Sequence, residues 1–410
     1  MFRKTVLLAV AGLASLLLAA SAPIGTIPFP LSNVSNTPGH LDEVRSAVTF
    51  NTGFMRTYFA VWQQNSADGL NTSVYGRLVN SNGLLNGYPV MFSPAAGVNI
   101  DPDVVYNPDN DQYLIVYARN NAGIYGLIIG NAGSTVLAEF PIASGPLVTD
   151  WYYRPAAAYS TVSHQYLVTW THNHNGFQGI EARTITNVGG TLGSIWDVTG
   201  LLTSDPDYAD VAWSSPNNEF LIVWNKTATP ATDMDVYGRR IQMDTSAGPA
   251  GSVFTILGSS DGESYPAVAS IARTSGTGQY LVVCQTHTSL GAYFVDGQLV
   301  GQAGVLEGGR LFVSNSTGHV PAVAGNSASQ EYLAAWPYDT GSLHARTIST
   351  SGIRGSEKSL PLNDEADTAV AAGAAGDFLI TGSGWVQAGY PYDVFGFLWG
   401  NRLWLPYVSR

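Results

Sequence analysis

Cysteine is almost absent from this chain, since Cys284 is the single cysteine among 410 residues. One thiol cannot form an intramolecular disulfide, so the fold must be held together by packing. Cys284 ends a hydrophobic segment, at a position where similar segments of the chain carry Trp or Tyr. We therefore interpret it as a small buried hydrophobic residue rather than a reactive thiol.

Charge is also scarce, because Asp, Glu, Lys and Arg together make up 12% of the sequence. The 30 acidic side chains outnumber the 18 basic ones, which gives a formal net charge of −12. Nucleic-acid binding needs clustered Lys and Arg, so this composition excludes it. We attribute the acidity to solubility. The 45 Gly and 21 Pro residues indicate a turn-rich β protein.

Metal-binding and catalytic signatures are missing as well. The sequence contains no HExxH, no P-loop and no Ser-x-Asp-x-Gly-x-x-x-Trp box of sialidase propellers. His172-Asn-His174 places two imidazoles together without a third ligand nearby in sequence, so we interpret both as polar loop residues and predict no metal. Calcium is the one cofactor left open, because acidic oxygens suit it, although no loop has calcium-loop spacing.

The N-terminus is typical of a secretory signal peptide. Arg3 and Lys4 precede an apolar run over residues 6–20, and Ala20-Ser-Ala22 fits a cleavage site. The run is shorter than the ~20 apolar residues that a membrane span needs. We predict a signal peptide over residues 1–22, no membrane span after its cleavage, and a secreted or cell-surface protein.

Seven similar hydrophobic segments recur along the rest of the chain. Two of them are Tyr58-Phe-Ala-Val-Trp62 and Phe220-Leu-Ile-Val-Trp224. The segments begin at Tyr58, Tyr113, Tyr166, Phe220, Tyr280, Tyr332 and Phe378, and subtracting these numbers gives spacings of 55, 53, 54, 60, 52 and 46 residues. Four-stranded units of about 40–50 residues are the signature of propeller blades.

Two further landmarks accompany each segment. An Ala- and Val-rich stretch such as residues 266–269 precedes it, and a Tyr-Gly-Arg-like stretch such as residues 236–239 follows it. Small residues suit the crowded strand nearest a propeller axis. We predict an all-β, seven-bladed β-propeller with four antiparallel strands per blade, built as one domain over residues 23–410. The blades are expected at about residues 44–93, 100–143, 151–199, 205–257, 262–314, 318–361 and 365–408.

The ring also needs a closing strand. Residues 27–32 resemble the fourth strands of later units but precede the first complete unit, so we expect them to pair into the last blade. Residues 403–408 are the alternative, because they follow a Gly400-Asn401 turn. Pro406 would confine them to an edge.

The Pro-Ala-Val-Ala, Tyr-Leu-Val-Val-Trp and Asp-Val-Tyr-Gly-Arg segments together resemble a repeat type of secreted bacterial β-propeller proteins. The resemblance covers nearly all of the mature chain. It implies a propeller fold and an extracellular, bacterial setting. It implies no activity and no site residues.

Unusual residues gather at one end of the predicted ring. Because strands within a blade alternate in direction, the starts of the first strands and the second-to-third loops open on the same face. Acidic and aromatic residues and long loops are found there. Such a face suits a polar ligand, while turn capping by Asp is the alternative explanation of the acids. The candidate ligand-binding residues are Asp103, Trp151, Tyr153, Asp207 and Tyr265.

We therefore expect a binding module without catalytic activity, whose partner is a glycan or a cell-surface protein. A carbohydrate-active enzyme, either a hydrolase or a lyase, is the alternative, with paired carboxylates such as Asp103 and Asp207 on that face. A structural subunit of a surface layer is the third hypothesis. The oligomeric state is left open by the sequence.

Overall fold

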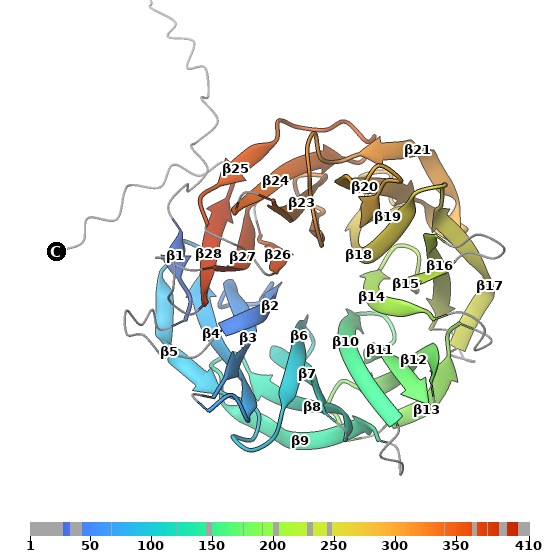
Figure 1. Ribbon diagram of the computed structural model, residues 1–410. Helices are drawn as coiled ribbons and strands as arrows, with labels where there is room; N and C mark the ends of the chain where they lie inside the picture. The colour runs from blue at the N-terminus through green and yellow to red at the C-terminus, as the bar shows by residue number, and fades with distance from the viewer. Residues whose placement is uncertain are drawn as a thin grey trace, which may run out of the picture.

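Each of the seven hydrophobic segments forms the second strand of a four-stranded antiparallel sheet in the computed structural model. The sheets are arranged as blades around a central axis, with the first strands innermost (Figure 1). The predicted seven-bladed β-propeller is confirmed. The structure describes residues 28–32, 43–66, 68–120, 122–144, 150–174, 176–190, 192–199, 205–227, 233–243, 248–339, 341–362, 367–374, 376–384 and 392–400.

In every blade the strands run from the axis outward. Blade 1 consists of β2 (Glu43–Phe50), β3 (Thr57–Asn65), β4 (Thr72–Asn80) and β5 (Leu85–Met91), and blade 2 of β6 (Asn99–Asn107), β7 (Gln112–Arg119), β8 (Gly123–Gly130) and β9 (Thr135–Ala143). Blade 3 consists of β10 (Asp150–Ser160), β11 (Gln165–His174), β12 (Phe177–Thr186) and β13 (Leu192–Asp197). Blade 4 consists of β14 (Asp207–Ser214), β15 (Glu219–Thr227), β16 (Met234–Gln242) and β17 (Gly248–Leu257).

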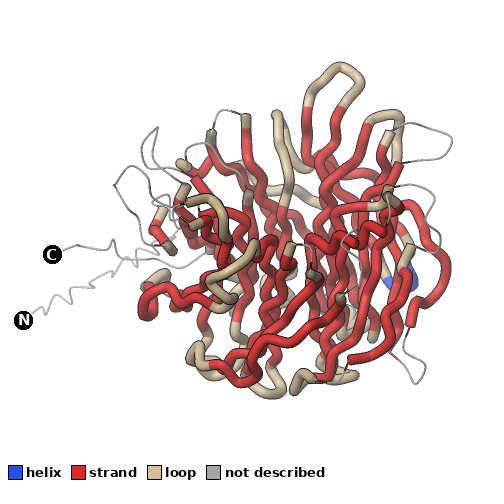
Figure 2. The backbone as a smooth tube through the Cα atoms, turned by 60° about the horizontal axis from the view of Figure 1, so that its bottom comes forward, coloured by secondary structure: helices blue, strands red, loops and turns tan. Residues whose placement is uncertain are grey.

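The remaining blades follow the same plan. Blade 5 consists of β18 (Gly262–Ala272), β19 (Gly278–His287), β20 (Tyr293–Val300) and β21 (Leu306–Phe312). Blade 6 consists of β22 (Ala322–Asn326), β23 (Glu331–Tyr338), β24 (Ser342–Ser349) and β25 (Lys358–Leu360). Blade 7 consists of β26 (Thr368–Ala372), β27 (Phe378–Gly384), β28 (Asp393–Trp399) and β1 (Phe29–Pro30). Strands dominate the tilted view of Figure 2, with one short 3-10 turn, η1 (Gln302–Gly304). Among the residues described, no helix has the length and apolarity of a membrane span.

The second strands form the core because adjacent blades bury both of their faces. Between blades 2 and 3, for example, Val116 of β7 packs in one cluster with Val168 and Trp170 of β11. Burial on both sides explains why these segments are continuously hydrophobic rather than alternating. Each large side chain buried in this way contributes about 1.5–3 kcal/mol. Cys284 is fully buried in a similar cluster, as its sequence context predicts.

The glycine of the Tyr-Gly-Arg repeat makes room for the fourth strand. A β-carbon on Gly238 would lie 2.6 Å from Cδ1 of Ile256, which belongs to the fourth strand of the same blade. A β-carbon on Gly396 of blade 7 would lie 2.7 Å from the ring of Phe29. Phe29 therefore occupies in blade 7 the place that a fourth-strand residue occupies in blade 4.

The arginine of the same repeat joins neighbouring blades. In four blades its Nη1 atom donates a hydrogen bond to a backbone carbonyl at or just past the fourth strand of the preceding blade. We call these residues the clamp arginines. The bonds run from Arg77 to Leu31 (3.1 Å), Arg183 to Ile142 (2.6 Å), Arg239 to Val198 (2.9 Å) and Arg346 to Val313 (2.6 Å).

The N-terminal segment closes the ring, as predicted for residues 27–32. β1 pairs antiparallel with β28, where Phe29 lies opposite Gly396 and Pro30 opposite Phe395, and the two strands lie side by side in Figure 1. The Leu31 amide extends the pairing with a 2.8 Å bond to the Val394 carbonyl. Residues 403–408, the alternative closing strand, lie outside the described residues.

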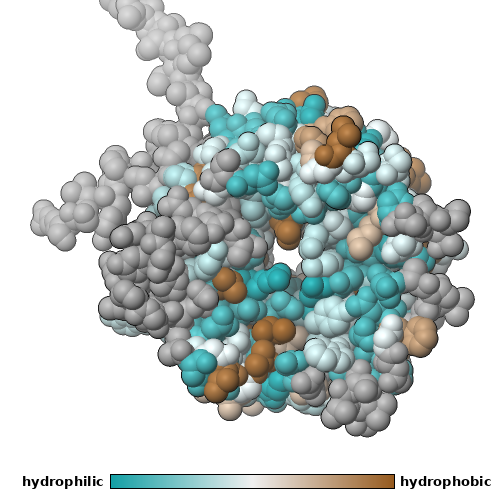
Figure 3. Space-filling view, viewed as in Figure 1, coloured by the Kyte–Doolittle hydropathy of each residue, from teal (hydrophilic) through white to brown (hydrophobic). Residues whose placement is uncertain are grey.

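Small side chains of the first strands line an axial channel with a volume of about 300 Å³. Ala47, Ala158 and Ala322 are among them, which confirms that the Ala-rich stretches are the innermost strands. Asp103 and Asp210 also line this channel. The face seen in Figure 3 is mostly hydrophilic and has an opening at its centre.

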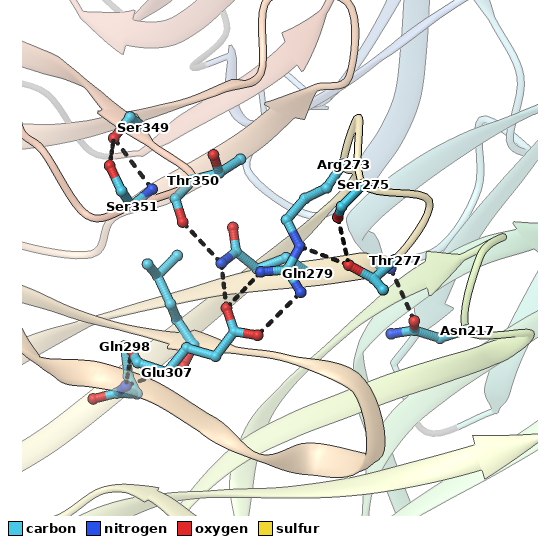
Figure 4. A network of polar contacts seen from close by, with 12 residues as sticks. Asn217, Arg273, Ser275, Thr277, Gln279, Gln298, Glu307, Ser349, Thr350 and Ser351 are labelled. Carbon is cyan, nitrogen blue, oxygen red and sulfur yellow. Dashed lines mark hydrogen bonds and ion pairs between the residues drawn. The ribbon is translucent and has the colours of Figure 1, made fainter.

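The two ends of the ring differ in construction. We call the end with the first-strand starts and second-to-third loops the loop face, and the other end the turn face. On the turn face, Glu307 of blade 5 accepts hydrogen bonds from both Arg273 and Gln279, and Gln279 also donates to the Thr350 carbonyl of blade 6 (Figure 4). The bond from Gln279 to Thr350 braces adjacent blades, so we assign this network to stability.

Candidate functional site on the loop face

Five of the first strands carry a β-bulge close to the loop face. At each bulge one residue other than glycine adopts the left-handed backbone conformation. We call these the rim residues, and they are Arg45, Asp101, Arg154, Tyr208 and Tyr265, with φ between 52° and 56°. That conformation costs roughly 1–2 kcal/mol for an L-residue, and such strain concentrates at binding and catalytic sites.

Side chains of the neighbouring blade hold the strained backbone in place. Gln63 of blade 1 accepts a 3.0 Å bond from the Asp101 amide of blade 2 through its Oε1 atom. Asn225 of blade 4 accepts a 3.2 Å bond from the Tyr265 amide of blade 5 through Oδ1. The rim conformation is thus fixed by the ring rather than by the bulge alone.

Three rim residues contact one another across blades 3, 4 and 5. Arg154 donates from Nη2 to the Tyr208 hydroxyl at 2.8 Å, and its guanidinium carbon lies 3.5 Å from the centre of the Tyr208 ring. The Tyr208 and Tyr265 rings lie edge to face, with centroids 4.1 Å apart. Cation–π and edge-to-face contacts of this kind fix the orientation of the rings.

Asp207 neutralises the arginine at the centre of this group. It forms an ion pair with Arg154 through Oδ2, and its Oδ1 accepts a 3.1 Å bond from the Thr171 hydroxyl. Burial lowers the pKa of Arg154, but the hydrogen bond and charge of Asp207 raise it, and the net shift is upward. The group therefore has rigid polar atoms and no net charge from this pair.

Two aromatic candidates stand next to this group on β10. Side chains alternate along a strand, so Trp151 and Tyr153 lie on the same side of β10. The Tyr153 ring centre lies 5.2 Å from the Arg154 guanidinium carbon. Trp151 is 51% exposed, which is unusual for so large an apolar ring.

Asp103 lies away from the other candidates, inside the channel. Its Oδ2 accepts a 2.7 Å bond from the Ala157 amide of blade 3, and Asp210 makes the equivalent 2.8 Å bond to the Val268 amide of blade 5. Burial raises the pKa of Asp103 to about 7, with a further contribution from the charge of Asp210, and raises the pKa of Asp210 to about 6. Both carboxyls thus serve as bridges between blades.

Of the five candidate residues, the structure brings together Tyr153, Asp207 and Tyr265. Trp151 lies beside them, whereas Asp103 lies apart in the channel. The residue that sequence reasoning missed is Arg154, which connects the group. Alignment of the five first strands shows the signal, because each rim residue stands two positions before the Ala or Asp at which regular pairing with the second strand resumes.

Two of the acidic residues at the starts of the first strands are not exposed on the loop face. Glu43 is buried, and burial raises its pKa to about 8. Glu263 is also buried, where it accepts a bond from Ser259 and pairs with Arg310 at 2.9 Å. These acids lie inside the blades and are not available to a ligand on the loop face.

The interpretation of His172 and His174 as loop residues is wrong. Both belong to β11, which pairs with β10 so that Asp150 lies opposite His174. Asp150, His172 and His174 form the one group in the described ranges with three or more His, Cys, Asp or Glu ligand atoms within 4.8 Å of one another. The third ligand that the local sequence lacked thus comes from the neighbouring strand.

No family model and no curated protein matches this chain. Solved structures do match: the BP39L lectin from Burkholderia pseudomallei is 13% identical, covers 86% of this chain and 98% of its own, and has a TM-score of 0.59. A protein of unknown function from Dyadobacter fermentans is 10% identical, covers 91% of this chain and 98% of its own, and has a TM-score of 0.54. At these identities the likeness shows the propeller fold alone.

Proposed function

We propose that this protein is a non-catalytic glycan-binding module whose site lies on the loop face at blades 3 to 5. The observation that carries the proposal is the half-exposed Trp151 beside the rigid group of Tyr153, Arg154, Asp207 and Tyr208. An exposed ring offers a surface for the apolar face of a sugar, and fixed polar groups orient its hydroxyls. The ion pair leaves no net charge, which favours a neutral sugar.

The fold supports this proposal without deciding it. The BP39L lectin, which shares the propeller fold, is a carbohydrate-binding protein by its name. A secreted or cell-surface location would place the site where glycans are found. That location is part of the proposal, because residues 1–22 lie outside the described residues.

A carbohydrate-active enzyme is the second candidate, favoured by the raised pKa values of Asp103 and Asp210 in the channel. A carboxyl protonated near neutral pH can act as a general acid. Both carboxyls, however, already accept backbone amide bonds that hold the blades together. Gly258-Ser-Ser-Asp-Gly262 spells Gly-x-Ser-x-Gly but connects β17 to β18 without a helix, so it forms no nucleophile elbow.

A glycan array read alongside a hydrolysis screen tests the proposal. We expect binding without turnover, and at least a thirtyfold loss of affinity in Trp151→Ala, since an aromatic anchor contributes ~2 kcal/mol or more. Tyr88→Ala is the matched control, because Tyr88 is 83% exposed on the outer strand β5. Equal affinity of the two variants would contradict the site. Turnover that Asp210→Asn abolishes would favour the enzyme.

A further inference from the structure

Two histidines and one aspartate meet on the side of β10 that faces away from Trp151. The β10–β11 register places Asp150 opposite His174 and Tyr152 opposite His172, so strand alternation puts all four side chains on one side of the sheet. The Nδ1 atom of His174 lies 2.5 Å from Oδ1 of Asp150, and Nε2 of His172 lies 4.0 Å from the same oxygen.

His172 is held in one orientation by two neighbours, Glu181 and Tyr152. Its Nδ1 atom lies 3.0 Å from Oε1 of Glu181, whose other oxygen accepts a 3.0 Å bond from the Trp170 indole. The Tyr152 ring stacks on the imidazole with centroids 4.3 Å apart and planes 10° apart. When one ring nitrogen gives its proton to a hydrogen bond with a carboxylate, the other nitrogen keeps a lone pair that can coordinate a metal ion. Metal-ligating histidines have this arrangement.

The second nitrogen of His172 has no hydrogen bond. Nε2 is buried and is one of the polar side-chain atoms left without a hydrogen-bond partner in the described part of the chain. Nε2 lies 4.0 Å from Oδ1 of Asp150, whose side chain is itself only 5% exposed. A buried polar atom without a partner is destabilising, so a fixed ring that presents one needs an explanation.

We propose that Asp150, His172 and His174 bind one divalent transition-metal ion, with Zn²⁺ as the ion that the donor set suits best. Two imidazole nitrogens and one carboxylate oxygen match zinc, whereas calcium takes oxygen ligands. Three protein ligands leave the fourth tetrahedral position to water or to a ligand oxygen. Glu181 is a positioning residue, because it acts on the ion through His172.

The site needs only a small adjustment to hold an ion. Ligand atoms at ~2.0–2.1 Å from a tetrahedral zinc ion lie about 3.4 Å apart. The Asp150–His174 contact must therefore open by about 1 Å, and the Asp150–His172 separation must close by about half that. His174 is 46% exposed, whereas His172 is held in place by Glu181 and Tyr152.

The competing explanation is a chain of charges without metal. A doubly protonated His172 would bridge Glu181 and Asp150, and His174 would pair with Asp150 from the other side. Both explanations make His172 important for stability, so loss of stability cannot separate them. Binding of the ion itself can.

Titration of the EDTA-dialysed full-length protein with ZnCl2 by calorimetry provides the test, with Co²⁺ absorption as a second readout. We expect one ion per chain, and at least a hundredfold loss of affinity in His172→Ala and in Asp150→Asn. Glu181→Gln should lower affinity ten- to hundredfold, the usual effect of changing a residue behind a ligand.

His164→Ala is the matched control, because His164 pairs with Asp109 at 2.6 Å and no third ligand joins this pair among the residues that the structure describes. This variant should bind zinc as the unchanged protein does. Equal zinc affinity in the unchanged protein, His172→Ala and His164→Ala would overturn the proposal. So would an unchanged protein that takes up no zinc, and the charge chain would then explain the cluster. Because the site lies on the other side of β10 from Trp151, neither result depends on glycan binding.

Discussion

Blades 3 and 6 share the same inner framework but differ on the loop face. Tyr166-Leu-Val-Thr-Trp170 and Tyr332-Leu-Ala-Ala-Trp336 fill equivalent core positions. Each blade also has a clamp arginine. The first strand of blade 3, β10, has 11 residues and a bulge, whereas β22 of blade 6 has five residues and a regular register.

The difference shows which residues of a repeat determine stability and which form the proposed binding sites. Residues that recur from blade to blade build the core, and in four blades the clamp arginines add a contact to the preceding blade. The residues before and within the bulge of β10 supply Asp150, Trp151, Tyr152, Tyr153 and Arg154, which are all the β10 residues of the proposed sites. Changes to the shared framework should therefore affect stability, and changes to the extension should affect binding.

The largest effect is expected from removing β1, which breaks the framework itself. Deletion of residues 28–32 leaves β28 as an open edge and takes away the carbonyl partner of Arg77. We expect a loss of more than about 3 kcal/mol in the free energy of unfolding, measured by urea denaturation. Deletion of residues 402–410 is the comparison. A larger cost for the tail would make the tail the closing strand.

The clamp arginines should come next. Arg183→Ala removes bonds to the Ile142 and Gly193 carbonyls, both 2.6 Å long. We expect a loss of about 1–3 kcal/mol, with partial recovery in Arg183→Lys, which offers no planar fork. Arg45→Ala on the rim should change stability by less than about 0.5 kcal/mol, since Arg45 is exposed and its ion pair with Asp101 is 3.9 Å long. Similar melting temperatures for Arg183→Ala and Arg45→Ala would contradict this division.

Relief of backbone strain at the rim should have a smaller effect, and this effect should stabilise the protein rather than destabilise it. Glycine accepts the φ of 56° at position 45 without steric cost. Arg45→Gly should therefore be more stable than Arg45→Ala by up to about 1 kcal/mol, even though glycine gains entropy in the unfolded chain. Paired urea titrations measure the difference. A less stable glycine variant would mean that the bulge is not strained.

The channel aspartates should give the smallest effect, because they face an open channel where solvent screens charge. Asp103 and Asp210 hold protons more tightly in the folded state, with pKa values of about 7 and about 6. Their contribution is complete below the unfolded pKa of about 3.9 and is lost as the pH rises toward 7. In the Asp103→Asn, Asp210→Asn double variant, the decrease in the free energy of unfolding with rising pH should be smaller by up to about 1 kcal/mol. An unchanged pH profile would contradict the raised values.

The framework was predictable from sequence because its physical requirements recur. A strand buried on both faces must be continuously hydrophobic, and Ala must line the crowded axis, so seven copies reveal the fold. The position of β1 followed from its likeness to fourth strands. The role of the Gly-Arg pair was not predictable, because the space beside Gly238 and the carbonyl beside Arg239 belong to other strands.

The site was only partly predictable, because its contacts cross between strands and blades. Asp150 lies 22 residues before His172 and meets it only through the β10–β11 register. The role of Arg154 could not be recognised from blade 3 alone, since its partners Asp207 and Tyr208 belong to the next blade. Asp103 looked like a site residue by type, yet its Oδ2 is taken by an amide of blade 3.

The clamp arginines also set an order in which the ring can assemble. Each reaches a carbonyl that precedes it in the chain, over 33 to 46 residues. Arg77 follows this rule, so β1 can attach to blade 1 while blade 7 has not yet been synthesised. Closure then requires β28 to add to a strand already in place, rather than a meeting of two loose ends. The entropy cost of joining β1 to β28, which closes the longest loop in the molecule, is thus met in two steps. An early local contact fixes β1, and β28 docks onto it later.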